Sequence, residues 1–178
     1  MISQGISHTA YDVMREYMIT GAELDGKYQI PMMERYTDRP GEDTVDFKDS
    51  FSPKIKNHRK LTVNFYIHDC EFERIWNNPD RYLEHLKCFH SVITPDFSMA
   101  VGQGGMPFAM NIWQKYRNHA LSYYLSMNGI KVIPNVNIPP EYCYDWAFDG
   151  VPKRSTVACC TNGRIKARVS REEFCKGF

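Results

Sequence analysis

The residues best suited to chemistry are two aspartates, Asp69 and Asp96, each at the end of a short apolar run. If these runs are neighbouring parallel strands, the two carboxylates meet at the carboxyl edge of one sheet, where sites of open α/β proteins form. Such a pair could hold Mg²⁺ or Mn²⁺, or divide acid and base roles if the pKa of one is raised. Capping of the next turn is the alternative role for an aspartate at a strand end.

Two further apolar runs end in amide and hydroxyl side chains, which are those of Asn135, Asn137, Thr161 and Asn162. Amides neither gain nor lose protons near neutral pH, so these groups suit recognition of a base, sugar or phosphate better than proton transfer. Because Asn followed by Gly is also an ordinary turn pair, Asn162 and Gly163 are equally consistent with a turn.

Stretches able to form helices separate the four apolar runs, which lie at 63–69, 91–96, 130–137 and 156–162. Asn78-Pro79-Asp80 predicts a helix start, because Asn caps free amides and Pro suits the first turn. Apolar residues recur every three to four positions from Phe108 to about Asn128 and predict a long helix. Strand–helix–strand units of this kind predict an α/β protein with a mainly parallel sheet of four to five strands, as a partial barrel or an open sheet.

The chain has 178 residues and 43% hydrophobic content, which fits a single domain. Within it we expect a helix at 7–19 and an irregular arm in residues 1–60, a βαβ core in 61–165, and the start of a C-terminal helix in 166–178. From 22 to 60 the arm is rich in Gly, Pro and Asp, with at most short strands near 28–33. It could cover a sheet face, contact a partner or act as a lid.

The charge composition of the chain limits the kinds of partner that it could bind. A formal charge of +1 produces no overall field for nucleic acid or anionic membrane, so such a partner would need a local patch. The concentrated basic segment, Lys54 to Lys60, could hold a phosphate backbone or form a solvated loop.

Six cysteines without a CxxC pair favour free, mostly buried thiols in a reducing compartment. Without a signal sequence or an apolar run of about 18 residues, the protein is predicted to be cytoplasmic and soluble, with no membrane partner.

No P-loop, dinucleotide fingerprint, GxSxG or HExxH motif occurs in the chain. The residues therefore predict where a site lies without naming a reaction, and the choice between an enzyme and a binding protein stays open.

Five segments follow one another in a recognisable order: Asn77-Asn78-Pro79, Thr94-Pro95-Asp96-Phe97-Ser98, Tyr116-Arg117-Asn118, residues 129–136, and Phe148-Asp149-Gly150-Val151-Pro152. Over about residues 60 to 165 this order resembles the DUF4417 family. The family has no assigned activity and is common in phages and mobile elements, so the resemblance implies an origin there. Carried onto this chain, the motif positions of the family are Asp96, Ser98, Arg117, Asn118, Pro134, Asn135, Asp149 and Gly150.

Two hypotheses follow. In the first, Asp69 and Asp96 hold a divalent cation, Arg117 meets the charge of a nucleotide, nucleic-acid or other phosphate-bearing ligand, and the remaining polar groups orient that ligand. Those groups are Ser98, Asn118, Asn135, Asn137, Asp149, Thr161 and Asn162. In the second, the protein binds and inhibits a host factor without catalysis, using segment 22–60 and the edge of the sheet.

Overall fold

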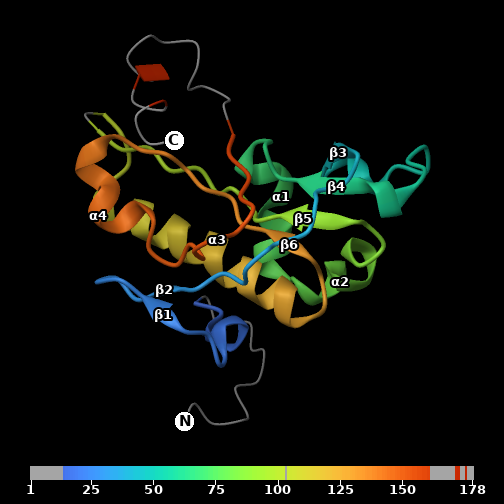
Figure 1. The fold of residues 1–178 in the computed structure, drawn as a ribbon, viewed down its shortest axis with the longest axis horizontal. Helices are drawn as coiled ribbons and strands as arrows, with labels where there is room; N and C mark the ends of the chain where they lie inside the picture. The colour runs from blue at the N-terminus through green and yellow to red at the C-terminus, as the bar shows by residue number, and fades with distance from the viewer. Residues whose placement is uncertain (1–13, 103, 161–170, 173–174, 176–178) are drawn as a thin grey trace.

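The computed structural model describes residues 14–102, 104–160, 171, 172 and 175. At its centre lies a sheet of four parallel strands in the order β3, β4, β5, β6 (Figure 1). The strands are β3 (Asp43–Asp46), β4 (Leu61–Asn64), β5 (Ser91–Ile93) and β6 (Val132–Ile133). The predicted α/β class with an open parallel sheet is confirmed, and the described residues form no closed barrel.

Helices fill the connections between the strands. α1 (Asp69–Asn77) and α2 (Asp80–Leu86) join β4 to β5, and α3 (Phe108–Met127) joins β5 to β6. The short helices η4 (Glu141–Cys143) and α4 (Tyr144–Ala147) follow β6. The predicted helices after Asn78 and from Phe108 are therefore confirmed, because their start signals and apolar spacing are local properties of the chain.

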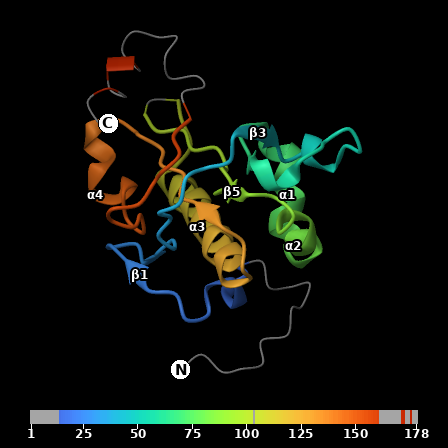
Figure 2. The same cartoon turned by 45° about the vertical axis from the view of Figure 1, so that its right-hand side comes forward.

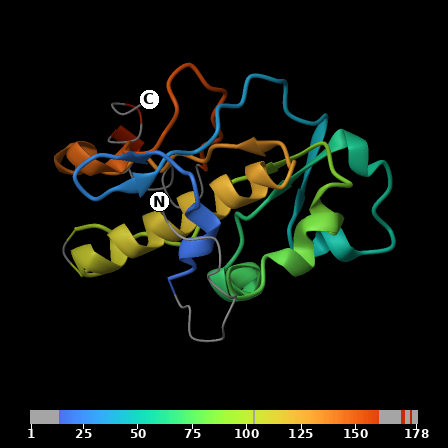
Figure 3. The same ribbon diagram turned by 90° about the horizontal axis from the view of Figure 1, so that it is seen from below.

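Segment 22–60 belongs to the body of the fold. It contains the hairpin β1 (Leu24–Asp25) and β2 (Ile30–Pro31), the edge strand β3, and two single turns, η2 (Asp49–Phe51) and η3 (His58–Lys60). The blue hairpin lies beside α3 in Figures 2 and 3. The prediction of an arm with strands only near 28–33 was wrong at β3, because Val45 is the only buried residue of that strand and leaves no apolar pattern in the sequence.

The predicted strand at 63–69 was too long, since β4 ends at Asn64 and Asp69 is the first residue of α1. Phe72, Ile75 and Trp76 are the buried residues of this helix, and their spacing of three and four residues was the signal for it.

The strand predicted at 156–162 is reduced to one bridge, where Ala158 lies parallel to Asn135. Ala158 donates its amide to the Pro134 carbonyl at 2.8 Å and accepts the amide of Val136 at 2.8 Å. Proline has no amide hydrogen, so Pro134 cannot continue the ladder toward β6. The remainder of this predicted strand, from residue 161, lies outside the described residues, as does most of the predicted C-terminal helix.

At the other end of the chain, the predicted helix at 7–19 lies partly outside the described residues, which here begin at Met14. Its described part is the short helix η1 (Glu16–Ile19).

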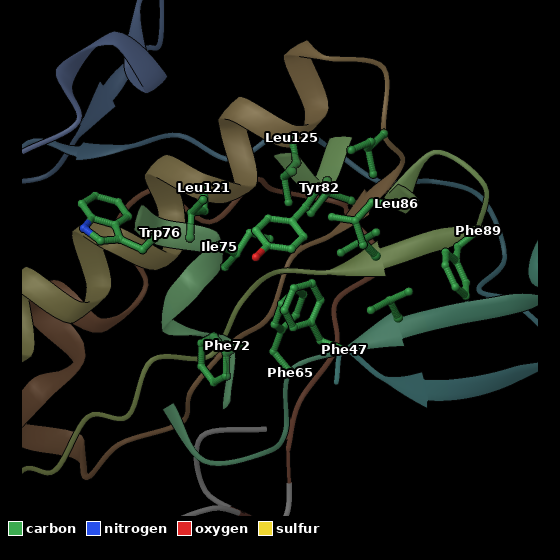
Figure 4. Packing of buried hydrophobic residues seen from close by; sticks show 14 of the residues in the cluster. Phe47, Phe65, Phe72, Ile75, Trp76, Tyr82, Leu86, Phe89, Leu121 and Leu125 are labelled. Atoms are coloured by element: carbon green, nitrogen blue, oxygen red, sulfur yellow. The ribbon is translucent and has the colours of Figure 1, made fainter. Parts of the chain in front are cut away.

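A row of aromatic rings crosses the core from the sheet to α1 (Figure 4). Phe47 stacks on Phe65 with ring centroids 4.8 Å apart, Phe65 meets Phe72 at 5.4 Å, and Phe72 meets Phe97 at 4.8 Å. All four side chains are fully buried. Phe47 and Phe65 directly follow β3 and β4, and Phe97 lies in the loop after β5, so this packing holds the loops at the carboxyl edge of the sheet in place.

No described helix has both the length and the apolar character needed to cross a membrane.

The six cysteines are free thiols, and of these only Cys143 is buried, so the expectation of mostly buried thiols was wrong. Cys70 and Cys88, for example, lie on the exposed sides of α1 and the turn after α2.

Candidate functional site

The carboxyl edge of the sheet carries a hydrogen-bonded network centred on Asp96. Oδ1 of Asp96 accepts the side-chain amides of both Asn135 and Asn137, each at 2.9 Å. Asn135 in turn accepts the hydroxyl of Tyr66 at 2.9 Å through its Oδ1. Tyr66 follows β4, Asp96 follows β5 and the two asparagines follow β6, so the parallel register of three strands brings these groups together.

Tyr66 is a permanent donor in this network. Burial raises the pKa of its hydroxyl far above the ordinary value, and the negative charge of Asp96 adds to the effect. The hydroxyl therefore stays protonated at every physiological pH and fixes the amide of Asn135 with its nitrogen toward Asp96.

A cleft of about 550 Å³ opens at this edge. Its walls combine charged, polar and apolar side chains, which are those of Lys48, Tyr66, Ile67, His68, Glu71, Asp96, Ser98, Met99, Asn137 and Cys160. Lys48 and Glu71 form an ion pair across it at 2.7 Å, with both groups partly exposed. This pair lowers the pKa of Glu71 and raises that of Lys48, so both stay charged.

Asp69 is not among the residues that line the cleft, but it is bonded to Ser98, which is. Its carboxylate accepts the backbone amide of Ser98 at 3.1 Å and the hydroxyl of Ser98 at 2.8 Å. The bond network thus runs from α1 to the loop that carries Asp96, two residues before Ser98. Asp69 is close to the site as predicted, and its oxygens hold a loop in this structure.

Arg117 and Asn118 hold the same loop from the side of α3. Asn118 accepts the amide of Phe97 at 2.8 Å, and the guanidinium of Arg117 lies 3.6 Å from the centroid of the Phe97 ring. Arg117 also donates to Glu73 at 2.5 Å and to Gln114 at 3.1 Å. Both side chains are buried and neither lines the cleft, so the structure places them as supports of Phe97.

Asp149 lies in a different part of the molecule, next to Asp25 and the buried amine of Lys115. Burial raises the pKa of Asp149, the charge of Asp25 raises it further, and the charge of Lys115 opposes both. Its Oδ2 is buried and has no hydrogen-bond partner among the described residues. The structure therefore does not bring Asp149 to the cleft. Thr161 and Asn162 lie outside the described residues.

Several cleft residues were not predicted as ligands. Lys48 lies between β3 and η2 in a segment without apolar periodicity, so no sequence signal indicated it. Tyr66 and His68 follow β4, and the position of a strand end was the signal that could have found them. Among the described residues, no group of three His, Cys, Asp or Glu side chains is arranged to hold a metal ion by itself.

A serine and a histidine also meet in the core, where Ser50 Oγ lies 2.9 Å from His85 Nε2. Ser50 donates its hydroxyl to the carbonyl of Phe47 at 2.7 Å, so His85 is the donor to Oγ. A catalytic histidine must accept the serine proton, which is the opposite arrangement. With Ser50 only 1% exposed, this pair is a structural contact.

Comparison with known proteins places these features in a family. The profile of a family described as "Domain of unknown function (DUF4417)" matches residues 22–178. The "Gene 1 protein" of Mycobacterium phage L5 is 35% identical over 116 residues, covering 65% of this chain and 49% of the phage protein. The "Gene 1 protein" of Mycobacterium phage D29 is 31% identical over 116 residues, covering 65% of this chain and 42% of that protein.

The chain thus spans half or less of the length of these curated relatives. No solved structure matches it significantly. The predicted resemblance to a phage-associated family is confirmed.

Proposed function

We propose, from the premise that the chain belongs to the DUF4417 family, that its polar cleft binds a nucleotide, a nucleic-acid strand or another phosphate-bearing ligand through a divalent cation at Asp96. The observation that carries the proposal is the fixed orientation of Asp96, whose Oδ1 accepts two amides from the neighbouring strand end. A carboxylate held in this way needs no rearrangement to meet a cation, which favours binding.

The charge of the cleft explains why the proposal includes a cation. Asp96 and Glu71 outnumber Lys48 among its charged side chains when His68 is neutral. A phosphate alone would be repelled, whereas Mg²⁺ or Mn²⁺ at Asp96 would reverse the local charge. Mg²⁺ in proteins commonly uses one or two carboxylates together with water and substrate phosphates, so a third protein carboxylate is not required.

The remaining polar groups of the cleft suit the rest of such a ligand. Ser98 and Asn137 offer hydroxyl and amide groups to a base or sugar, and Lys48 offers a charge to a phosphate if its pair with Glu71 opens. Under this proposal Asp69, Arg117 and Asn118 act indirectly, because their contacts fix the loop from Asp96 to Ser98.

Calorimetric titration of Mn²⁺ in the presence and absence of pyrophosphate tests the proposal. We expect weak binding of either component alone and at least tenfold tighter binding of Mn²⁺ when pyrophosphate is present. Asp96→Asn should abolish this enhancement, because the amide keeps an acceptor for Asn135 and Asn137 but loses the charge. Asp43→Asn, an exposed change on β3, is the matched control and should leave it intact.

If Mn²⁺ and pyrophosphate bind as well to the Asp96→Asn variant, or do not bind the native protein together, the proposal fails. A nucleoside triphosphate in place of pyrophosphate then shows whether a base adds affinity, as Asn137 would predict.

A second candidate function is the binding of a host protein, and a separate surface favours it. Large apolar side chains are exposed around the amino end of α3, with Phe108 at 48%, Met110 at 49% and Tyr142 at 67%. Phe108 and Tyr142 border a groove of about 330 Å³ that is also lined by Tyr28 and Trp146. Exposed apolar groups gathered in this way are typical of protein interfaces.

The experiment for this candidate uses point variants, since deletion of residues 22–60 would remove β3 from the sheet. We expect Phe108→Ser with Tyr142→Ser to abolish capture of a host protein from a lysate, and Asp96→Asn to leave it unchanged. The reverse pattern would contradict this candidate.

A further inference from the structure

The amino edge of the sheet, opposite the cleft, carries a second charged feature in the connection from β3 to β4. Residues 52–60 approach β4 from this side, because η3 ends at Lys60 and β4 begins at Leu61. In the three views the teal connection extends from one end of the molecule (Figures 1, 2 and 3). Four of its side chains are exposed cations, which are those of Lys54, Lys56, Arg59 and Lys60.

Local contacts hold this basic loop in one shape. Ile55 packs against the main core, and Asn57 adopts a left-handed backbone with φ of 56° that turns the chain. The ring of His58 packs edge-on against Phe89 with centroids 4.8 Å apart. Arg59 donates to the carbonyl of Lys87 at 3.2 Å. A solvated loop would need none of these anchors, so the fold sets the course of the loop backbone and the position of the Arg59 guanidinium.

Most of the positive charge in the loop is not neutralised. Lys60 pairs with Glu42 at 3.0 Å. In the described part of the chain, Lys54, Lys56 and Arg59 take part in no ion pair. Arg59 and Lys60 line a hollow of about 470 Å³ together with Asn57, His58 and Cys88. Three cations on one short loop, all outside the described ion pairs, attract a polyanion more strongly than a single phosphate, because each neutralised phosphate adds its own gain from released counterions.

We infer that this basic loop binds the phosphate backbone of duplex DNA without reading its sequence. The lining of the hollow contains no Phe, Tyr or Trp side chain. Binding of single strands generally uses aromatic stacking platforms, so their absence here favours a duplex. Membrane insertion requires apolar side chains beside the charges, and Ile55 is turned to the core instead. This inference does not depend on the cleft or on a divalent cation.

Fluorescence anisotropy with a short labelled DNA duplex, in buffer containing EDTA, tests the inference over roughly 50 to 200 mM salt. The test variant is Lys54→Gln with Lys56→Gln and Arg59→Gln. A plot of log Kd against log salt concentration should lose about 0.9 in slope for each phosphate contact removed, or between 2 and 3 in all, on the order of the three charges changed.

The control variant changes three exposed cations elsewhere, Lys27→Gln with Lys153→Gln and Arg154→Gln, and has the same net charge. It should keep the native slope, and so should Asp96→Asn. Thermal unfolding monitored by circular dichroism checks that both triple variants are folded. Equal losses in the two triple variants, or no binding of duplex by the native protein at low salt, would overturn the inference. Tighter binding of a single-stranded oligonucleotide, an RNA duplex or anionic vesicles through the same three residues would overturn it as well.

Discussion

Lys115 Nζ lies 3.1 Å from His119 Nε2, one turn apart on α3 and almost completely buried. His119 Nδ1 donates to the carbonyl of Pro31 at 2.9 Å, so its Nε2 is left to accept a proton from the lysine. Lys115 also donates to the carbonyl of Ala147 at 2.8 Å. These two side chains connect the β1–β2 hairpin, α3 and α4. In the sequence they are simply four residues apart on a helix, and that spacing does not indicate the contacts with Pro31 and Ala147.

The buried amine predicts a rise in stability at alkaline pH. Burial lowers the pKa of Lys115 from 10.5 to about 8, although the charges of Asp149 and Asp25 oppose the change. Between these two values the unfolded chain binds a proton that the folded chain lacks, so the free energy of unfolding rises with pH by at most about 3 kcal/mol. Urea unfolding between about pH 7.5 and 10.5 measures it.

Lys115→Met should lose this rise, and Lys27→Met, at an exposed lysine, should keep it. If the native protein and Lys115→Met show the same dependence on pH, the amine is not the group responsible.

Acid should destabilise the protein through His119. Burial lowers the pKa of this imidazole well below 6.5, and the charge of Lys115 lowers it further. As pH falls through about 6.5, the unfolded chain gains a proton that the folded chain cannot accept, so the free energy of unfolding falls. His119→Gln should show a smaller loss between about pH 6.5 and 5, measured as the urea midpoint of each variant. A dependence on pH identical to that of the native protein would contradict this assignment.

Gly150 should tolerate no side chain. Its φ is +73°, and a Cβ there would lie 2.6 Å from His119 Nδ1 and 2.7 Å from the carbonyl oxygen of Pro31. Gly129 has a similar φ of +83° with no atom within 4 Å, so Gly129→Ala is the matched control. We expect Gly129→Ala to cost about 1 kcal/mol and Gly150→Ala to cost at least about 2 kcal/mol more. If denaturant unfolding gave the same loss of free energy for both variants, the hairpin would have moved to make room for the added Cβ at Gly150.

The ion pair of Arg117 and Glu73 should contribute more than an exposed pair. The Arg117 side chain is 9% exposed, so Glu73→Gln leaves a buried charge whose remaining contacts among the described residues are Gln114 and two aromatic rings. A double-mutant cycle with Arg117→Met should give a coupling free energy of about 2 kcal/mol. The same cycle on the exposed pair of Lys131 and Asp38 should give less than about 1 kcal/mol. Similar values for both cycles would argue against a special role of Arg117.

Tyr66→Phe should weaken both the fold and the cleft. It removes the donor to Asn135 Oδ1, which is buried, and we expect a loss of about 1 to 2 kcal/mol in the free energy of unfolding. With Asn135 then held through its bond to Asp96 and no longer by Tyr66, the joint affinity for Mn²⁺ and pyrophosphate should fall several-fold. Tyr124→Phe removes a hydroxyl bonded to the exposed Asp80 and serves as the control. If Tyr66→Phe kept the native joint affinity, this hydroxyl would not contribute to binding in the cleft.

The site was predictable to the extent that strand ends define it. Asp96, Asn135 and Asn137 follow apolar runs, and parallel pairing brings such positions to one edge, as the network at Asp96 confirms. Asp69 was placed near this edge for the wrong local reason, since it begins α1 and does not end β4. Arg117 was predicted to meet a ligand, but in the structure it pairs with Glu73. Helical spacing could not reveal this partner, because Glu73 lies on another helix.

The sequence by itself determined the elements whose signals are local: the α3 periodicity, the start of α2 and the polar ends of β5 and β6. Only the tertiary structure decided that β3 joins the sheet, that Arg117 and Asn118 support Phe97, and that Asp149 lies beside Lys115 and not in the cleft. The reason is physical: apolar period and capping act over a few residues, whereas the partner of a buried charge or an edge strand is set by packing between segments distant in the chain.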